Sequence, residues 1–281
     1  MLLQIANATP HIDIAAEEVF RIGFIPVTNS MILNIFSLFL TAFIFLKISK
    51  ELKNQKRRGF VSRLFIWIYS ALRKQVFEII PDRNIARIVA PIPITMFFFI
   101  MISYYLGILP IVGTISVGNG DHMVHLFRGP ASDLNFTLGL AIVSIVGAQI
   151  YAIKVHGFFG NLSRYIRNPL TDPAGAFEGL LEIIAEFSRM ISLTLRLFGN
   201  VFAGEILIMM IAFLSGYGSP IALPIFYLFE LFIGAIQSYI FFMLTTIFTS
   251  LGVAHLEHSE TSSSDTQKME GEVIKISKQN N

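Results

Sequence analysis

The stretch that decides the fold is AGAFEGLLEIIAEFSRMISLTLRLFGNVFAGEILIMMIAFL, residues 174 to 214. It contains no proline and is mostly apolar, so it is compatible with one continuous helix. About forty residues at 1.5 Å each make roughly 60 Å of helix, twice the hydrocarbon thickness of a bilayer. A second apolar stretch, residues 220 to 251, follows the short turn SGYGSP. The sequence therefore predicts a long, strongly tilted, antiparallel hairpin of two membrane helices.

The overall composition is that of an integral membrane protein. Of the 281 residues, 54% are hydrophobic and only 14% are charged, whereas soluble domains carry about a quarter charged residues. The net charge of +2 offers no electrostatic footprint for a nucleic acid. The sequence has no cysteine, which excludes disulfides, thiolate metal sites and cysteine nucleophiles.

Three shorter apolar stretches precede the hairpin, each with about the twenty residues needed to cross a bilayer. They run over residues 26–46, 89–109 and 134–153. Residues 60–80 mix aromatic and aliphatic groups with charged ones, a pattern typical of an amphipathic helix that lies in the membrane interface. The predicted fold class is all-α and polytopic, with about five membrane helices and one interfacial amphipathic helix.

Polar and small residues in two of these crossings recur at helical spacing, which indicates the faces that pack against protein. In the first crossing they are Ser30, Asn34, Ser37 and Thr41. In the third crossing they are Thr137, Ala141, Ser144 and Ala148.

Basic residues cluster after the first and the third crossing. The first cluster extends from Lys47 to Arg63, and the second consists of Lys154, Arg164 and Arg167. By the positive-inside rule both loops lie on the cytoplasmic side, so residues 1–25 lie outside. These residues begin without a basic segment or a small-residue cleavage site, so we expect no cleavable signal peptide. Residues 26–255 form the membrane domain, and residues 256–281 are expected to be a disordered cytoplasmic tail.

Charged residues inside the hairpin are the candidate functional residues, because an arginine at the centre of a membrane helix costs on the order of 3 kcal/mol. Arg196 shares a helix face with Ser192, Gly199, Asn200 and Ala203. Glu205 lies nine residues beyond Arg196, about 180° around the helix, so the two do not form a simple same-face pair.

Further polar groups lie on both helices of the hairpin. On the last helix, one stripe that would face the partner helix holds Glu230, Gly234, Gln237 and Phe241. Nearer the cytoplasmic end of the first helix lie Glu182, Glu186 and Arg189, of which the last two are spaced to form an ion pair.

The residue types divide the chemistry between them. Carboxylates can accept and release protons, whereas arginine keeps its proton in any protein environment. A fixed cation between two carboxylate-lined regions is therefore a poor proton carrier and a good electrostatic barrier. The structural alternative is that Arg196 holds a nearby glutamate and that Glu205 and Gln237 only bridge helices.

The segment SLTLRLFGNVFAGE, Ser192 to Glu205, closely resembles the hallmark segment of subunit a of F-type ATP synthases. The resemblance extends to ELFIGAIQSYIFFMLTTIF on the last helix, to PASDLNFTLGLAI at the third crossing and to the KVHGFF loop, and loosely covers residues 11–255. It implies a non-catalytic subunit, without cofactor or metal, that forms two half-channels for protons.

The resemblance also implies roles for individual residues. Arg196 would separate the two half-channels, with Asn200 as its polar neighbour and Gln237 facing it across the hairpin. Glu205 and Glu230 would belong to the half-channel that opens outside.

Three further positions follow from the same comparison. Asp133 would lie at the outer mouth, and Glu182 and Ser192 would belong to the cytoplasmic half-channel. Tyr104 and Tyr105 stand where relatives often carry Asn or Asp, so the resemblance gives no support for a polar role there.

The partners implied by the resemblance are the c-subunit ring, the b-subunit peripheral stalk and the remaining subunits of the synthase. Protons, with Na⁺ as the alternative, would neutralise a carboxylate on the ring and leave after nearly a full turn, while ATP forms on other subunits. The expected location is a bacterial plasma membrane, with an organelle inner membrane as the alternative.

Other classes of protein fit the sequence less well. A secondary transporter is the main alternative, but no internal repeat is visible and five unequal crossings do not divide into halves. A purely structural anchor leaves Arg196, Glu205 and Glu230 without a purpose. An intramembrane metalloenzyme fits less well still, because His255 and His258 lack the HExxH spacing. Asp121, His122 and His125 could bind a metal in the outer loop, but no further ligand is evident.

Overall fold

The computed structural model describes residues 18–22, 25–53, 59–80, 82–109, 112, 116–117, 124–125, 128–163, 165 and 173–254. The helices are α2 (Asn29–Lys53), α3 (Phe60–Ile79), α4 (Arg83–Val89), α5 (Pro91–Ile108), α6 (Leu134–Ser163), α7 (Pro173–Ser215) and α8 (Ser219–Ala254). Two short turns of 3-10 helix are η1 (Pro130–Ser132) and η2 (Gly216–Gly218). The predicted all-α, polytopic fold class is confirmed.

Two short antiparallel strand pairs accompany the helices and were not expected from the sequence. Strand β1 (Glu18–Ile22) pairs with β2 (Ile25–Thr28), and β3 (Ser116–Val117) pairs with β4 (Val124–His125). Strands of two to five residues are too short for the alternation of apolar and polar residues to stand out in a sequence.

Four stretches of the described chain are long and apolar enough to cross a membrane: residues 29–53, 83–108, 134–155 and 174–253. The last stretch holds both α7 and α8, so five long apolar helices are present in the described residues. Helix α2 continues beyond residue 46 to Lys53, because lysines in its last turns suit the negative end of the helix dipole.

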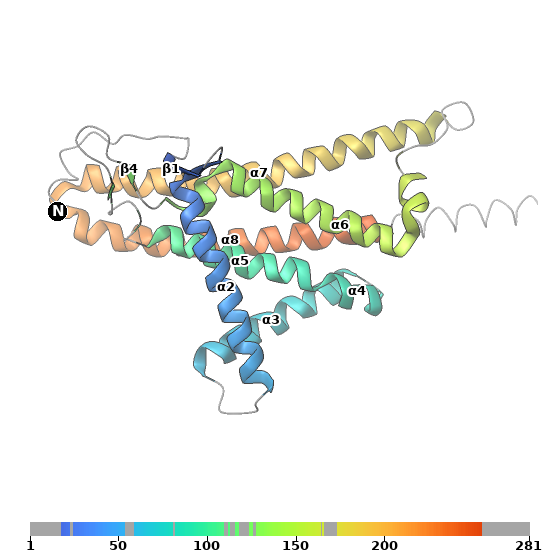
Figure 1. Cartoon of the computed structure of the whole chain (residues 1–281), viewed down its shortest axis with the longest axis horizontal. Helices are drawn as coiled ribbons and strands as arrows, with labels where there is room; N and C mark the ends of the chain where they lie inside the picture. The colour runs from blue at the N-terminus through green and yellow to red at the C-terminus, as the bar shows by residue number, and fades with distance from the viewer. Residues whose placement is uncertain are drawn as a thin grey trace, which may run out of the picture.

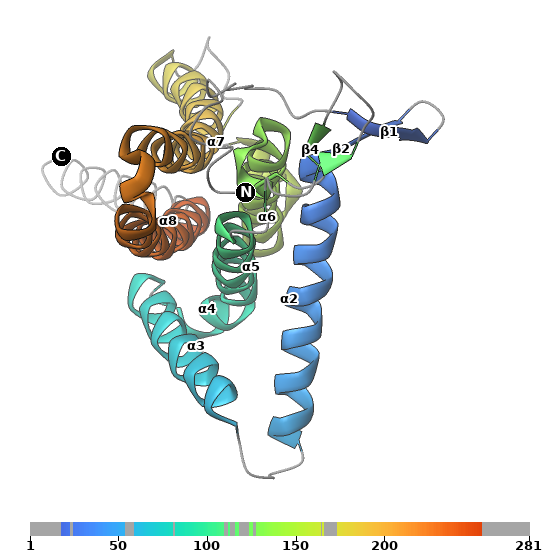
Figure 2. The ribbon, with the colours of Figure 1, turned by 90° about the vertical axis from the view of Figure 1, so that its left-hand side faces the viewer.

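The hairpin of α7 and α8 runs along the longest axis of the molecule, with α5 and α6 beside it (Figure 1). Helix α2 crosses this group at a steep angle, so the hairpin is strongly inclined to the first apolar helix (Figure 1). Turn η2 reverses the chain, and Gly216 adopts a positive φ of 47° there, which glycine does at little cost. In the orthogonal view, α3 diverges from α2 and runs back below α5 and α8 (Figure 2).

The predicted packing faces of α2 and α6 are confirmed by burial. On α2, Ser30, Ser37 and Thr41 are buried, whereas Phe36, Phe39 and Phe43 on other faces are exposed. The four small residues of α6, Thr137, Ala141, Ser144 and Ala148, are all buried. Hydrogen bonds of 3.0 Å between Ser103 and Ser37 and of 2.8 Å between Ser144 and Thr245 join these faces to α5 and α8.

Two apolar clusters form the core. One gathers around Phe98, whose ring stacks on Phe65 of α3 at 3.8 Å between centroids. The other lies between α5, α7 and α8 and includes Ile100, Leu197 and Phe241. Helix α3 buries one edge through residues such as Leu72 and exposes large apolar side chains elsewhere. The second cluster fixes the hairpin against α5 and so positions the charged residues between these helices.

Helix α6 is interrupted at Gly157, where φ is 75° and ψ is 165°. Only glycine adopts this conformation readily, so Gly157 interrupts the regular helix close to Val155, where the apolar stretch ends.

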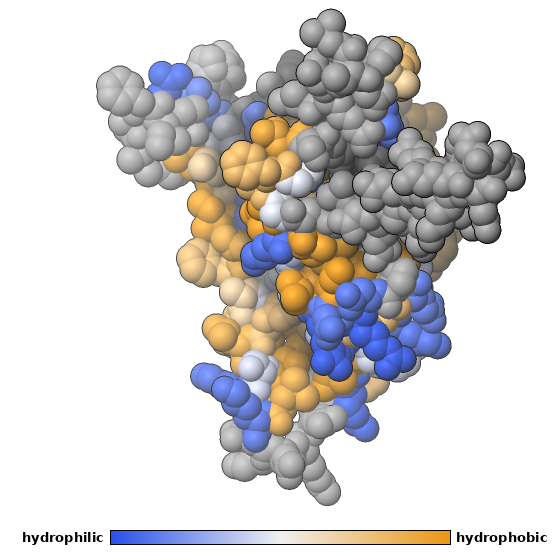
Figure 3. Space-filling view, turned by 90° about the vertical axis from the view of Figure 1, so that its right-hand side faces the viewer, coloured by the Kyte–Doolittle hydropathy of each residue, from blue (hydrophilic) through white to orange (hydrophobic). Residues whose placement is uncertain are grey.

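Viewed from the right-hand side of Figure 1, the surface carries broad hydrophobic areas with hydrophilic side chains gathered in separate patches (Figure 3). Such a distribution suits a protein surrounded by lipid between two aqueous layers.

Candidate functional site

One face of α7 carries the candidate arginine and is exposed along its length. Arg196 and the residues predicted to share its face, Ser192, Gly199, Asn200 and Ala203, are all exposed. A side-chain carbon added at Gly199 would meet no other part of the described chain within 4 Å. The opposite face of α7 packs into the core through Leu193 and Leu197. The structure therefore confirms the common face and leaves it uncovered by the described residues.

The guanidinium of Arg196 makes a single long hydrogen bond within the described residues. Its Nη2 lies 3.4 Å from the Ser192 hydroxyl, one helical turn away. Within the described part of the chain, no carboxylate lies in ion-pair range of this guanidinium. The described residues therefore do not include a glutamate that fixes Arg196 by an ion pair, as the structural alternative requires.

Asn200 and Gln237 join the two helices of the hairpin one turn from Arg196. The Asn200 amide donates to the Gln237 carbonyl oxygen at 2.6 Å. Gln237 is only 2% exposed, so this bond satisfies a polar group in the core. The sequence placed Gln237 opposite Arg196, and its partner in the structure is Asn200.

Glu230 is buried between α5, α7 and α8, with 3% of its surface exposed. The hydroxyl of Tyr104 on α5 donates a hydrogen bond to Glu230 Oε1. On the other side the carboxylate lies against Gly204 of α7, where a side-chain carbon would overlap it. The stripe of Glu230, Gly234, Gln237 and Phe241 is buried throughout. Glu230 and Gln237 face α7 at Gly204 and Asn200, as predicted, whereas Gly234 faces Tyr104 of α5.

Glu205 also lies close to Glu230, because it directly follows Gly204, against which the Glu230 carboxylate packs. Its carboxylate lies against Gly129 and Ser132 at turn η1, and the charge of Arg128 acts on it. Arg128 in turn lies 3.3 Å from the Ser132 hydroxyl. Two carboxylates are thus brought together at the end of the hairpin that carries η2.

Asp133 follows η1 and connects two helices. One carboxylate oxygen accepts the backbone N–H of Asn135 at 2.9 Å, which caps the start of α6. The other accepts the hydroxyl of Ser30, at the start of α2, at 2.6 Å. Because η1 also contacts α5 and α7, Asp133 helps to hold four helices together near this turn.

We expect Asp133→Ala to lower stability by about 1–2 kcal/mol, through loss of the helix cap and of the bond to Ser30. The measurement is the apparent melting temperature of the purified membrane sector. Asp82→Ala is the matched control, because Asp82 caps α4 through Asn84 at 2.7 Å. An equal loss in both variants would mean that the connection to Ser30 contributes nothing.

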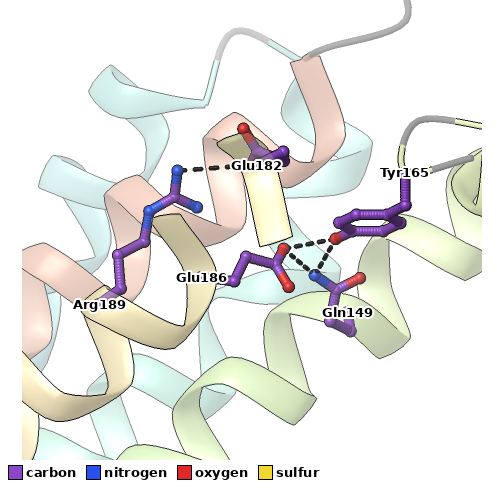
Figure 4. A network of polar contacts seen from close by, with 5 residues as sticks. All are labelled: Gln149, Tyr165, Glu182, Glu186 and Arg189. Atoms are coloured by element: carbon purple, nitrogen blue, oxygen red, sulfur yellow. Dashed lines mark hydrogen bonds and ion pairs between the residues drawn. The ribbon is translucent and has the colours of Figure 1, made fainter. Parts of the chain in front are cut away.

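The other end of the hairpin carries a network of polar contacts between α6 and α7 (Figure 4). Glu186 of α7 accepts hydrogen bonds from the Gln149 amide and from the Tyr165 hydroxyl, the latter at 2.5 Å. Gln149 accepts a further bond from Asn161 at 3.0 Å. The network joins α7 to α6 and to the segment that follows Gly157.

The predicted pairing of Glu186 with Arg189 is wrong. Arg189 lies 3.4 Å from Glu182 instead (Figure 4), and its guanidinium also stacks over the ring of Phe248. Glu186 is drawn toward α6 by Gln149 and Tyr165, partners that spacing along α7 alone does not reveal.

Several residues of the site were missed by sequence reasoning. Tyr104 has a polar role, and Gly129 and Gly204 provide the space for two carboxylates. The residues considered for a metal site, Asp121, His122, His255 and His258, lie outside the described residues, as does the side chain of His125. In the described ranges no group of three His, Cys, Asp or Glu side chains could hold a metal ion.

The fold and the site define an all-α, multi-pass membrane protein in which an arginine and several glutamates lie within one long apolar hairpin, as expected of an ion-transport subunit. The family described as ATP synthase A chain matches residues 20–250. The chain belongs to this family, whose members are subunits a of ATP synthases, and it is a membrane component of such a complex.

Individual relatives agree with the family. ATP synthase subunit a of Mycobacterium bovis is 36% identical over 192 residues, which cover 68% of this chain and 73% of the relative. The subunit a of Marinomonas sp. is 28% identical over 256 residues, covering 86% and 88%. That of Oceanobacillus iheyensis is 28% identical over 247 residues, covering 85% and 96%.

Proposed function

We propose that the chain forms the two half-channels that carry protons to and from a c-subunit ring, and so couples proton flow to rotation and ATP synthesis. The observation that carries this proposal is the position of Arg196. It is exposed on α7, no carboxylate of the described chain pairs with it, and carboxylates lie toward both ends of the same helix.

The spacing of the charged residues along α7 supports two separate carboxylate regions, one on each side of Arg196. Arg196 is nine residues from Glu205 and fourteen from Glu182, or about 14 Å and 21 Å along the helix axis. Because arginine keeps its charge, it repels a proton that would pass directly from one region to the other. The same charge favours the ionised form of any mobile carboxylate that passes the exposed face.

The polar residues outline a route with two parts. Protons from outside would reach Glu205, which lies against η1, and Glu230, and would then enter the ring beside Asn200 and Gln237. After nearly a full turn of the ring they would leave on the other side of Arg196. Ser192 is the first polar residue there on the exposed face of α7, and Glu182 lies two to three helical turns further on.

The remaining features of the proposal concern the surroundings of the chain. The chain is non-catalytic, with ATP formed on other subunits, and the b-subunit stalk holds it still. Lysines at the end of α2 and Lys154 on α6 favour a cytoplasmic position for these ends, with the N-terminus outside. A bacterial plasma membrane is the proposed location, and H⁺ is the proposed ion.

A photocrosslinking experiment tests the proposed contact with the ring. The chain has no native cysteine, so Ala203→Cys provides a single attachment point on the Arg196 face for a benzophenone maleimide. After irradiation of membranes that contain the whole complex, we expect a crosslinked product with the c subunit. Val143→Cys on α6, which is also exposed, is the control and should give none. Absence of the product from Ala203→Cys, or equal yields from both variants, would contradict the proposal.

A further inference from the structure

Tyr104 is buried in the core next to Glu230. It is 2% exposed, and its ring packs in the same apolar cluster as Ile100, Leu197 and Phe241. From this position its hydroxyl donates to Glu230 Oε1. The phenol can rotate little, because helices α5, α7 and α8 enclose its ring. Tyr104 therefore offers the carboxylate a donor in a fixed position.

Two glycines make room for this pair. At Gly234 of α8, an added side-chain carbon would lie 2.8 Å from Tyr104 Cε1 and 3.0 Å from Cγ, far closer than van der Waals contact. At Gly204 of α7 it would overlap the Glu230 carboxylate. Glycine is unfavourable inside a helix, so its presence on both sides indicates a socket shaped for the phenol and the carboxylate.

We propose that Tyr104 is a positioning residue that fixes the Glu230 carboxylate for proton transfer. The hydroxyl of Tyr104 occupies Oε1, which leaves Oε2 to take up and release the transported proton. The phenolic proton stays on Tyr104 throughout, so one proton enters at Oε2 and one leaves from it. This inference rests on the proposed function, in which Glu230 belongs to the outer half-channel.

Tyr105 provides a matched comparison on the same helix. Its hydroxyl donates to the backbone carbonyl of Leu231 at 3.2 Å and not to a carboxylate. Replacing either tyrosine by phenylalanine removes one hydroxyl and keeps the ring. The other ionisable groups beside this pair are the Glu205 carboxylate, which is the same in both variants, and the Tyr105 phenol itself.

The first measurement is ATP-driven proton pumping by the complete complex in inverted vesicles. We expect Tyr104→Phe to lower the pumping rate about tenfold, as for loss of one hydrogen bond to a charged group. Tyr105→Phe should stay within about twofold of the unmodified complex. Co-purification of the c-ring with each variant establishes that assembly is intact.

The second measurement separates positioning from packing. Passive proton flux through the membrane sector is recorded against pH. We expect Tyr104→Phe to change the pH profile, because the carboxylate that takes the proton has lost its donor. A packing defect would instead lower the flux by the same factor at every pH. An unchanged profile, or full pumping by Tyr104→Phe, would overturn the proposal.

Gly234→Ala is an independent variant that displaces the ring without removing the hydroxyl, and it should reproduce the effect of Tyr104→Phe. Gly139→Ala is its control, because an added carbon at Gly139 of α6 meets nothing within 4 Å. Glu230→Gln distinguishes the two levels of inference. If Glu230→Gln pumps normally, the role of Glu230 in the proposed function fails along with the positioning role. If Glu230→Gln is impaired and Tyr104→Phe is normal, only the positioning role fails.

Discussion

Arg196→Ala is expected to abolish ATP-driven proton pumping while the complex remains assembled. The side chain is exposed, and its one side-chain hydrogen bond among the described residues is to the Ser192 hydroxyl at 3.4 Å. Its removal therefore leaves the packing of α7 intact, at a cost within about 0.5 kcal/mol. What disappears is the fixed positive charge between the two carboxylate regions, so protons could pass between them without rotation of the ring.

Inverted vesicles provide the measurement for Arg196→Ala. Pumping should fall to background, c-ring should still co-purify, and passive proton leak should rise. Leu195→Ala is the matched control, because Leu195 is the preceding residue of the helix and 55% exposed. It should pump almost normally. Undiminished pumping by Arg196→Ala would contradict the proposed function.

The second large effect is expected at Glu230. Glu230→Gln keeps the size of the side chain and removes the group that exchanges protons, so translocation should slow by about a hundredfold or more, the usual contribution of a positioned acid or base. Glu186→Gln is the comparison, because Glu186 is a carboxylate held by Gln149 and Tyr165 at the other end of the hairpin. There we expect a loss of no more than about threefold, since an amide oxygen can still accept those two hydrogen bonds.

Initial rates of proton uptake at a fixed ATP concentration compare the two variants directly. Equal losses in the two variants would show that the Glu186 carboxylate is as necessary for proton transfer as the Glu230 carboxylate is. In that case Glu186, and not only Glu182, would have to be included in the cytoplasmic half-channel.

The faces of the helices were predictable because their signal is local. Ser30, Ser37 and Thr41 recur at helical spacing within one stretch of chain, and an apolar background makes such a stripe conspicuous. The hairpin was predictable for a similar reason, since length and the absence of proline are properties of one segment.

The environment of Glu230 was not predictable in the same way. Tyr104 lies 126 residues away in the sequence, and only the packing of α5 against α8 brings the two together. Gly204 and Gly234 carry no chemistry of their own, so their importance emerges only when their neighbours are known. The pairing of Arg189 with Glu182 was missed because Glu186 bonds instead to Gln149 of α6 and to Tyr165, which follows that helix.

The small residues beside Arg196 have a mechanical consequence. Helices normally lock together as ridges of large side chains enter grooves, which gives each contact a preferred register. Gly199 and Ala203 have small side chains or none on the exposed face of α7, so at these two positions the face offers no ridge with which a neighbouring helix could interlock. In the proposed function, the chain would therefore serve as a stationary bearing, and a ring that turns against Gly199 and Ala203 would meet no ridge of large side chains there.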